Sequence, residues 1–237
     1  MRGVFELNVL ITGVSFGLGK SLKNQYLDMG ENVYGLSRTK VTDCNHKIFD
    51  LSILSDDIYS KVLKDLLEGQ KYFDLVILNA GILGNIQKFN DVSMDDLDNI
   101  MNTNVFSNKL LLDNLYKMGV NIKQVVCISS GASQNTYKGW GGYSISKAAL
   151  RMMMKVYSKD ILETHFTSLA PGLVDTQMQK HLCNDVDVKE FPETSKFIES
   201  RDNGITRSSD EVAKDVVKII PDLLDLESGS YIDLRME

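Results

Sequence analysis

A tyrosine and a lysine spaced one helical turn apart are the residues of this sequence that most directly indicate acid–base chemistry. Tyr143 and Lys147 would share one face of a helix. A phenol ionises near pH 10 and catalyses proton transfer poorly at neutral pH unless a nearby cation stabilises the phenolate. Lys147 is placed to be that cation. Chance alone supplies about one such pair in a chain of this composition, so the pair needs further support.

Two polar residues would lie near this pair if the chain forms a parallel sheet. Ser130 follows the apolar segment 124–128, and Asn79 follows the apolar segment 75–78. In open α/β sheets ligands bind at the carboxyl ends of the strands, where both side chains would then lie. Asn104 falls within an expected helix, where asparagine is disfavoured unless its side chain has a specific hydrogen-bonding role. These residues together favour proton transfer to or from a small molecule.

Three glycines lie between the first apolar segment and the first helical pattern. Gly13, Gly17 and Gly19 permit a tight turn, let the backbone approach a pyrophosphate, and let the helix pack closely on the strand. The phosphate would meet unpaired N–H groups and the positive end of the helix dipole. Their spacing differs from the GxGxxG fingerprint, and a purely structural turn is the competing interpretation. We expect a dinucleotide-binding turn.

The end of the second apolar segment indicates which dinucleotide is bound. An acidic side chain there would bind the ribose hydroxyls of NAD, whereas a cation would bind the 2′-phosphate of NADP. This chain has Ser37 and Arg38 at that place and no carboxylate. Arginine suits a phosphate because its guanidinium presents a fork of donors. We therefore expect NADP(H), the alternative being a surface arginine that faces only water.

Short apolar segments alternate with helical periodicity along the whole chain, which predicts a doubly wound α/β fold. Continuous apolar strands are typical of a sheet covered on both faces, so we expect a mostly parallel, seven-stranded sheet with helices on both sides. The expected strands are 7–11, 32–37, 47–49, 75–78, 124–128, 166–169 and 231–234. The expected helices are 18–29, 53–68, 93–118 with a bend, 142–162, and one from the capping box at Ser208 to Pro221.

The length fits one domain over residues 1–237. Residues 175–207 show little periodicity and many charges, which predicts an irregular substrate lid, or else a merely solvated excursion.

Composition excludes several classes of protein. The chain is 43% hydrophobic and 24% charged, as in ordinary globular proteins, and its net charge of −6 without a basic run disfavours nucleic acid as a partner. No apolar stretch approaches the roughly 20 residues that span a bilayer. Three cysteines without a CxxC motif and three histidines without ligand spacing predict neither disulfides nor a metal site. With a strand pattern beginning near Leu7, we expect no leader peptide and a cytoplasmic location.

Six motifs in this order resemble the short-chain dehydrogenases/reductases, in their compact single-domain branch, over nearly the whole chain. The motifs are TGxxxGxG at Thr12–Gly19, Asp50-Leu51, Asn79-Ala80-Gly81, Asn104, Ser130 with Tyr143 and Lys147, and Pro171-Gly172 with Thr176. The resemblance implies an oxidoreductase that uses a nicotinamide dinucleotide.

The resemblance also implies roles for the matching residues. Tyr143 would donate a proton to a carbonyl that Ser130 polarises and positions, and Lys147 would bind the nicotinamide ribose and lower the pKa of the tyrosine. Asn104 would hold a water in a proton relay, and Thr176 would contact the nicotinamide carboxamide. The expected cofactor-binding residues are Gly13, Ser15, Phe16, Gly17, Leu18, Gly19, Ser37, Arg38, Asp50, Leu51, Asn79, Ala80, Gly81, Lys147, Pro171, Gly172, Val174 and Thr176.

Within the family, segments 138–140, 170–179 and 228–233 look like the sepiapterin reductases and the bacterial benzil reductases. This implies an NADPH-dependent reductase of a small ketone or dicarbonyl. The expected pocket residues are Tyr137, Trp140, Met178 and Asp233, of which Asp233 matches the aspartate that anchors a pterin. Phe16 stands where NADP-preferring members often carry a basic residue, so the cofactor prediction depends mainly on Arg38.

Two alternatives remain open: a reductase of a keto-sugar or another pathway intermediate, and a catalytically silent NADP-binding regulator. Related enzymes pair through the tyrosine-bearing helix and the one before it, which implies a homodimer or homotetramer.

Overall fold

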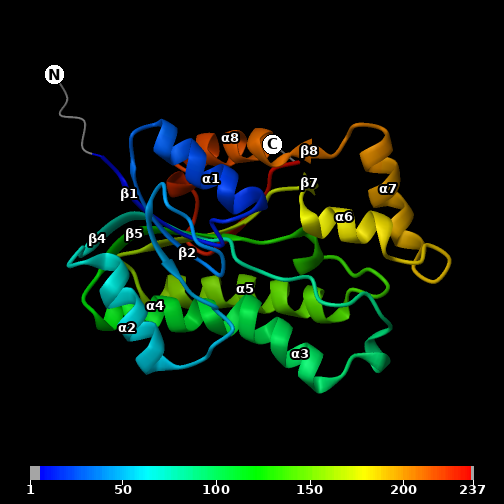
Figure 1. Cartoon of the computed structure of the whole chain (residues 1–237), viewed down its shortest axis with the longest axis horizontal. Helices are drawn as coiled ribbons and strands as arrows, with labels where there is room; N and C mark the ends of the chain where they lie inside the picture. Colours follow the sequence, from blue (N-terminus) through cyan, green and yellow to red (C-terminus); the bar gives the residue numbers. More distant parts are fainter. Residues whose placement is uncertain (1–5, 236–237) are drawn as a thin grey trace.

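Seven parallel strands form the central sheet of the computed structural model, which describes residues 6–235 (Figure 1). The strands lie in the order β3-β2-β1-β4-β5-β6-β9, and every neighbouring pair is parallel. Their bounds are β1 Asn8–Thr12, β2 Asn32–Ser37, β3 Asn45–Ile48, β4 Tyr72–Leu78, β5 Asn121–Ile128, β6 His165–Ala170 and β9 Ser230–Asp233. The predicted fold is confirmed, and this sheet is wholly rather than mostly parallel.

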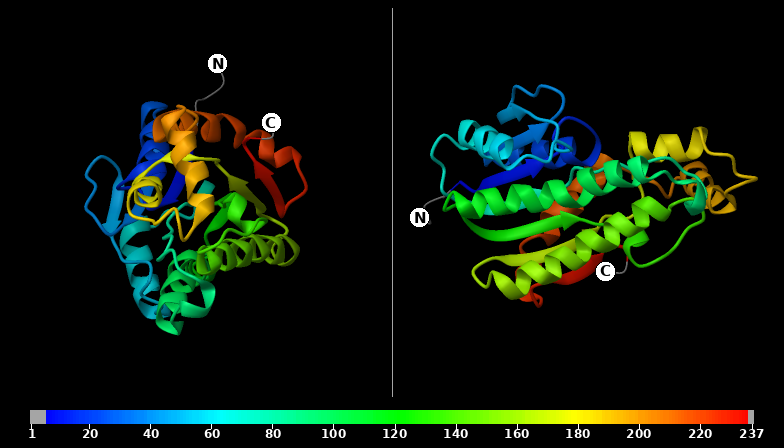
Figure 2. Two further views of the ribbon diagram at one scale, coloured as in Figure 1. Left: turned by 90° about the vertical axis from the view of Figure 1, so that its right-hand side faces the viewer. Right: turned by 90° about the horizontal axis from the view of Figure 1, so that it is seen from below.

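Helices cover both faces of the sheet (Figures 1 and 2). Successive side chains of a strand point to opposite faces, so β1 places Leu10 in one core and Val9 and Ile11 in the other. Burial on both sides explains why the strands are continuous apolar runs. On one face lie α1 Gly17–Asp28 and α8 Ser209–Ile219, and on the other lie α2 Asp56–Leu67, α4 Ser107–Lys117 and α5 Gly141–Asp160.

Serine side chains begin three of the helices. The Oγ atoms of Ser55 and Ser93 accept hydrogen bonds from the first turns of α2 and of α3, which spans Met94–Met101, and Ser208 with Glu211 forms the predicted capping box of α8. The bend expected between residues 93 and 118 is a π-helical segment, Asn102–Phe106, between α3 and α4.

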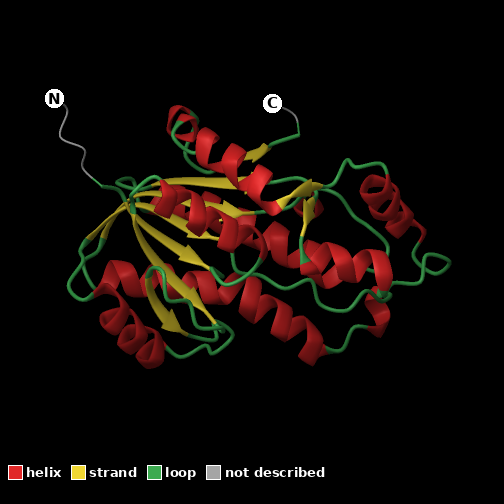
Figure 3. Ribbon diagram, turned by 45° about the horizontal axis from the view of Figure 1, so that its top comes forward, coloured by secondary structure: helices red, strands yellow, loops and turns green. Residues whose placement is uncertain are grey.

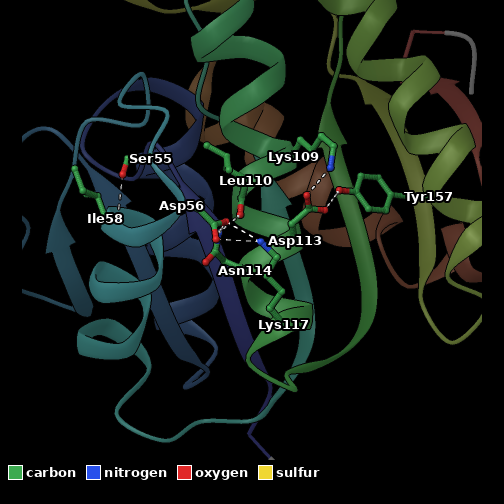
Figure 4. A network of polar contacts seen from close by, with 9 residues as sticks. All are labelled: Ser55, Asp56, Ile58, Lys109, Leu110, Asp113, Asn114, Lys117 and Tyr157. Atoms are coloured by element: carbon green, nitrogen blue, oxygen red, sulfur yellow. Dashed lines mark hydrogen bonds and ion pairs between the residues drawn. The ribbon is translucent and has the colours of Figure 1, made fainter.

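Polar contacts fix α4 between its two neighbours (Figure 4). Asn114 Nδ2 and Lys117 Nζ each lie 2.9 Å from Oδ1 of Asp56, at the start of α2. On the other side, Tyr157 Oη of α5 donates to Asp113 Oδ1 at 2.6 Å. Exposed ion pairs contribute little to stability, but Asn114 is buried, so its bond orients α4 against α2.

Residues 175–207 contain two helices, which corrects the expectation of an irregular segment. The helices α6 and α7 lie at the end of the sheet toward which the strands point (Figure 3). Each spans eight residues, and α7 buries none of them fully, so neither leaves a clear periodic signal. The bounds are α6 Gln177–Asn184 and α7 Ser195–Asp202, joined to the fold by the two-residue strands β7 Val174–Asp175 and β8 Arg207–Ser208.

Over residues 6–235, no helix combines the length and the apolar character that crossing a membrane requires. In the same part of the chain, no three His, Cys, Asp or Glu side chains are grouped so that they could hold a metal ion.

Candidate active site

A cavity of about 610 Å³ opens at the carboxyl ends of the strands. It lies where the strand order reverses, because β2 and β3 are added on one side of β1 whereas β4, β5 and β6 are added on the other. Open α/β sheets bind ligands at such a switch point. The structure thus brings the loops after the central strands, which sequence analysis singled out separately, around one space.

Thr12 and Asn79 join the two sides of the switch point. Oγ1 of Thr12 accepts hydrogen bonds from the backbone N–H groups of Asn79 and Ala80, each at 3.0 Å. The Asn79 side chain returns a bond from Nδ2 to the Thr12 carbonyl at 2.9 Å. Asn79 therefore lies at the same end of the cavity as the glycine-rich turn, and it holds that turn in place.

The glycine-rich turn fits a pyrophosphate. A Cβ atom on Gly19 would lie 2.2 Å from the Gly13 carbonyl oxygen, so this close packing requires glycine, and Gly13 has a φ of 77° that other residues rarely adopt. The N-cap of α1 is Phe16, whose side chain caps nothing, and the first turn of the helix carries no acidic residue. The N–H groups of that turn are thus available to an anion.

The residues after β2 and β3, which are expected to bind the adenosine part of a dinucleotide, form one end of the cavity. The Ser37 hydroxyl donates to the Thr39 carbonyl at 2.8 Å, so it supports the loop more than it offers a ligand contact. Arg38 is exposed and lines the cavity, and it belongs to none of the ion pairs formed within residues 6–235. Hydrogen bonds from Ser52 lower the pKa of Asp50, which stays ionised beside Leu51 in the cavity wall.

Tyr143 and Lys147 of α5 meet Ser130, which follows β5, as the sequence predicts. Burial raises the pKa of Tyr143 to about 12, and a hydrogen bond with Ser130 partly offsets that rise. Lys147 is 4% exposed, and its Nζ donates to the Ile128 carbonyl at 2.8 Å.

Two features limit the influence of Lys147 on the pKa of Tyr143 in this structure. Its Nζ lies 5.7 Å from the centre of the Tyr143 ring and is bonded elsewhere. Burial also opposes its own charge and lowers the pKa of Lys147 to about 8.

Asn104 is wholly buried and does not line the cavity. Its Oδ1 accepts from the N–H of Ile82 at 2.8 Å, and its Nδ2 donates to the Ile82 carbonyl at 2.8 Å and to Ser146 Oγ at 2.9 Å. The side chain therefore holds the loop after β4 against α5, next to Gly81. The unusual asparagine within a helix does have the hydrogen-bonding role that its position predicts.

The far end of the cavity has an aromatic wall. Tyr137, Trp140 and Met178 line it, as expected, and so does Phe197 of α7, which sequence analysis did not single out. The rings of Phe197 and Trp140 are stacked with their centres 5.0 Å apart. Phe197 lies in a stretch without periodicity, so only the fold brings it to this wall.

Asp233 does not line the cavity, which corrects its assignment to the substrate pocket. The residue is 8% exposed, and its carboxylate accepts a hydrogen bond from Arg235 Nε at 2.8 Å. This pairing holds the pKa of Asp233 below its usual range. Arg235 itself lines the cavity beside Gly172. The spacing of an aspartate and an arginine two residues apart was the available signal.

The other residues expected at a cofactor also line the cavity. They come from the glycine-rich turn and from the loops after β4 and β6, and Thr176 packs against Gly17 from the opposite wall. They are Ser15, Leu18, Ala80, Gly81, Pro171, Gly172, Val174 and Thr176.

Comparisons with known proteins agree with this geometry. The family model described as short chain dehydrogenase matches residues 7–187. Benzil reductase ((S)-benzoin forming) of Bacillus subtilis is 30% identical over 95% of this chain and 97% of its own length. The NADPH-dependent pterin aldehyde reductase of Arabidopsis thaliana is 28% identical over 72% of this chain and 76% of that protein. A solved short-chain dehydrogenase/reductase from Saccharomyces cerevisiae shares the fold, with a TM-score of 0.84, 24% identity, and coverage of 96% and 95%.

The buried ammonium of Lys147 makes a prediction about stability and pH. Folding lowers its pKa from 10.5 to about 8, so between these values the unfolded chain holds a proton that the folded protein has lost. Raising the pH through this window therefore favours the folded state. The free energy of unfolding of the wild type, minus that of Lys147→Met, should rise from pH 8 to pH 10.5 in urea titrations.

The variant Lys61→Met removes an exposed ammonium on α2 and serves as the control for the loss of charge. Its difference from the wild type should stay flat over the same pH range. A flat difference for Lys147→Met as well would contradict a burial-lowered pKa.

Proposed function

The chain belongs to the short-chain dehydrogenase family, and on that premise we propose that it is an NADP(H)-dependent reductase of a small ketone or dicarbonyl. The family is the one predicted from the motifs, and it makes the chain an oxidoreductase. The observation that carries the finer proposal is one cavity with two ends. Its glycine-rich turn and Arg38 suit a phosphorylated dinucleotide, and its Ser130, Tyr143 and Lys147 suit a carbonyl.

Two features support NADP(H) over NAD(H). The guanidinium of Arg38 lies at the cavity wall after β2 with no ion-pair partner in the described part of the chain, so it can bind a 2′-phosphate. The uncapped first turn of α1 can bind the pyrophosphate. Among the relatives, the plant pterin aldehyde reductase is NADPH-dependent by name.

The residues at the other end supply the acid. A pKa of about 12 keeps Tyr143 protonated at neutral pH, so its phenol can donate a proton to the oxygen of a carbonyl. The hydroxyl of Ser130 can donate a second hydrogen bond to the same oxygen as negative charge develops there. Below about pH 8 Lys147 is charged and adds a favourable field. The bound dinucleotide would supply the hydride.

The substrate end suits an aromatic or otherwise apolar carbonyl compound. Tyr137, Trp140 and Phe197 offer rings rather than the polar groups that a keto-sugar would need. Trp140 is 6% exposed, so its ring forms part of a largely buried wall at this end of the cavity. Benzil, the dicarbonyl in the name of the Bacillus relative, is the first compound to test.

The helices between residues 175 and 207 are the proposed lid. Met178 of α6 and Phe197 of α7 both face the cavity, so movement of this helix pair would open or close its substrate end. Along the chain, the two helices are linked to the rest of the fold through the short β7–β8 pair and adjoining loops. In this proposal residues 1–237 form one catalytic domain that includes the lid.

A homo-oligomer is the proposed assembly. On α5 the side chains of Ile145, Met152 and Val156 are 43%, 58% and 53% exposed, at helical spacing i, i+7 and i+11. An apolar stripe of this kind favours burial against another copy of the chain.

Replacing the proposed proton donor should abolish turnover. Tyr143→Phe keeps the ring and removes the hydroxyl, so the rate of NADPH oxidation with benzil should fall about 10²- to 10⁴-fold. NADPH binding, measured by calorimetry, should be retained. Tyr137→Phe, which removes a phenol from the same cavity, is the matched control and should stay within about threefold of the wild type. An undiminished rate in Tyr143→Phe would contradict the assignment of Tyr143 as the proton donor. NADPH binding without turnover by the wild type would favour a catalytically silent regulator.

Arg38 should discriminate between the two dinucleotides. A hydrogen bond to a charged group contributes about 1.5–3 kcal/mol, so Arg38→Ala should weaken NADPH binding about tenfold to a hundredfold. NADH, which lacks the 2′-phosphate, should bind the variant as it binds the wild type. Arg201→Ala removes an arginine that pairs with Asp202 outside the cavity and should change neither affinity. Equal losses for NADPH and NADH would count against the proposed phosphate contact.

A further inference from the structure

A second cavity, of about 320 Å³, lies between α5 and the segment that leads into β9. The two cavities share no lining residue, although residues 228–231 of the second belong to the segment 228–233 noted in the sequence. Its lining is polar and mostly basic. Arg151, Lys155 and Lys159 follow each other at four-residue spacing along one face of α5, opposite Glu227, Ser228 and Tyr231.

The guanidinium of Arg151 is held in a fixed orientation by an aromatic ring. It stacks on the Tyr231 ring, with the central carbon 4.8 Å from the ring centre. Its Nε is buried and has no hydrogen-bond partner within residues 6–235. A buried donor without an acceptor costs free energy, so the unpaired Nε calls for an explanation. The stacked ring keeps the guanidinium in one plane, and its two Nη groups, which form no hydrogen bond within the described residues, remain as donors for a planar or tetrahedral anion.

The charges around the cavity do not balance. Lys159 pairs with Glu227 at 3.2 Å. No ion pair formed within the described ranges involves Arg151 or Lys155, which leaves two uncompensated cations at the wall. The Ser228 hydroxyl lies at the same wall and already accepts from Phe166 N–H, so its proton is available to an acceptor. Two cations and a hydroxyl donor match a dianion.

We propose that this cavity is a second anion site, which binds inorganic phosphate or the phosphate group of a small monoester. A phosphate monoester carries about −1.5 to −2 charges at pH 7, which matches the charge that Arg151 and Lys155 leave unbalanced. A carboxylate would neutralise only one of them. The cavity volume lies at the lower end of the range for small-molecule sites, which suits a compact phosphorylated compound.

The site is connected to the catalytic serine. Tyr231, on which Arg151 stacks, places its hydroxyl 3.5 Å from the Ser130 carbonyl oxygen. Gln134, at the edge of the second cavity, is bonded through its N–H to the Gly131 carbonyl directly after Ser130. An anion bound at Arg151 would therefore rest against the segment that positions Ser130.

Amide NMR of the full chain during titration with sodium phosphate tests the proposal, with sodium chloride at equal ionic strength as the salt control. The amides of residues 228–231 should shift saturably with phosphate and not with chloride. Phosphate affinity at these amides should fall at least tenfold in Arg151→Gln and at least threefold in Lys155→Gln. Lys61→Gln, on α2, should leave it unchanged. A parallel titration with phenyl phosphate distinguishes the two sources, since tighter binding than inorganic phosphate identifies a monoester ligand.

The amides of Gly17 and Gly19 report separately on phosphate in the first cavity, so this result does not depend on the proposed enzymatic function. Shifts confined to those glycines, or shifts near residue 230 that chloride reproduces, would overturn the second site. So would equal affinities in the wild type and in both cavity variants. If Arg151→Gln does not fold, the exposed Lys155 decides the question through Lys155→Gln.

Discussion

The bonds between Thr12 and Asn79 are the interaction on which the rest of the site depends. They join β1 to β4 at the point where the strand order of the sheet reverses, and they fix both the glycine-rich turn and the loop before Ile82. Asn104 then ties that loop to α5, which carries Tyr143 and Lys147. A chain of hydrogen bonds thus sets the distance between the proposed phosphate end and the proposed proton-donating end of one cavity.

Burial decides the electrostatics of the proton-donating end. It raises the pKa of Tyr143 and lowers that of Lys147, so each side chain is pushed toward its neutral form. A neutral phenol is the form that a proton donor needs. The ammonium of Lys147 bonds to the Ile128 carbonyl, and further polar groups brought by a ligand would favour its charged form. The site therefore sacrifices some stability to keep a cation beside the reacting groups.

Sequence reasoning succeeded where a local pattern has a physical cause. Strands buried on both faces must be apolar throughout, and Gly19 must be glycine because a side chain would meet the Gly13 carbonyl. It failed where tertiary structure decides. Phe197 reaches the cavity on a short helix without periodicity, and Asp233 is taken from the pocket by Arg235, two residues away. The direction of the Tyr143 pKa shift depends on burial, which neither the spacing nor the residue types reveal.

The central claim is that this cavity holds a dinucleotide and a carbonyl together so that hydride passes between them on one face only. Its most direct test uses NADPH deuterated at nicotinamide C4 on either face, with aromatic ketones and dicarbonyls including benzil, and mass spectrometry of the alcohols. Because Tyr143 is fixed on one side of the cavity, deuterium from only one of the two preparations should appear at the reduced carbon. Deuterium in the alcohol from both preparations, or from neither, would contradict the account, as would no alcohol from any compound.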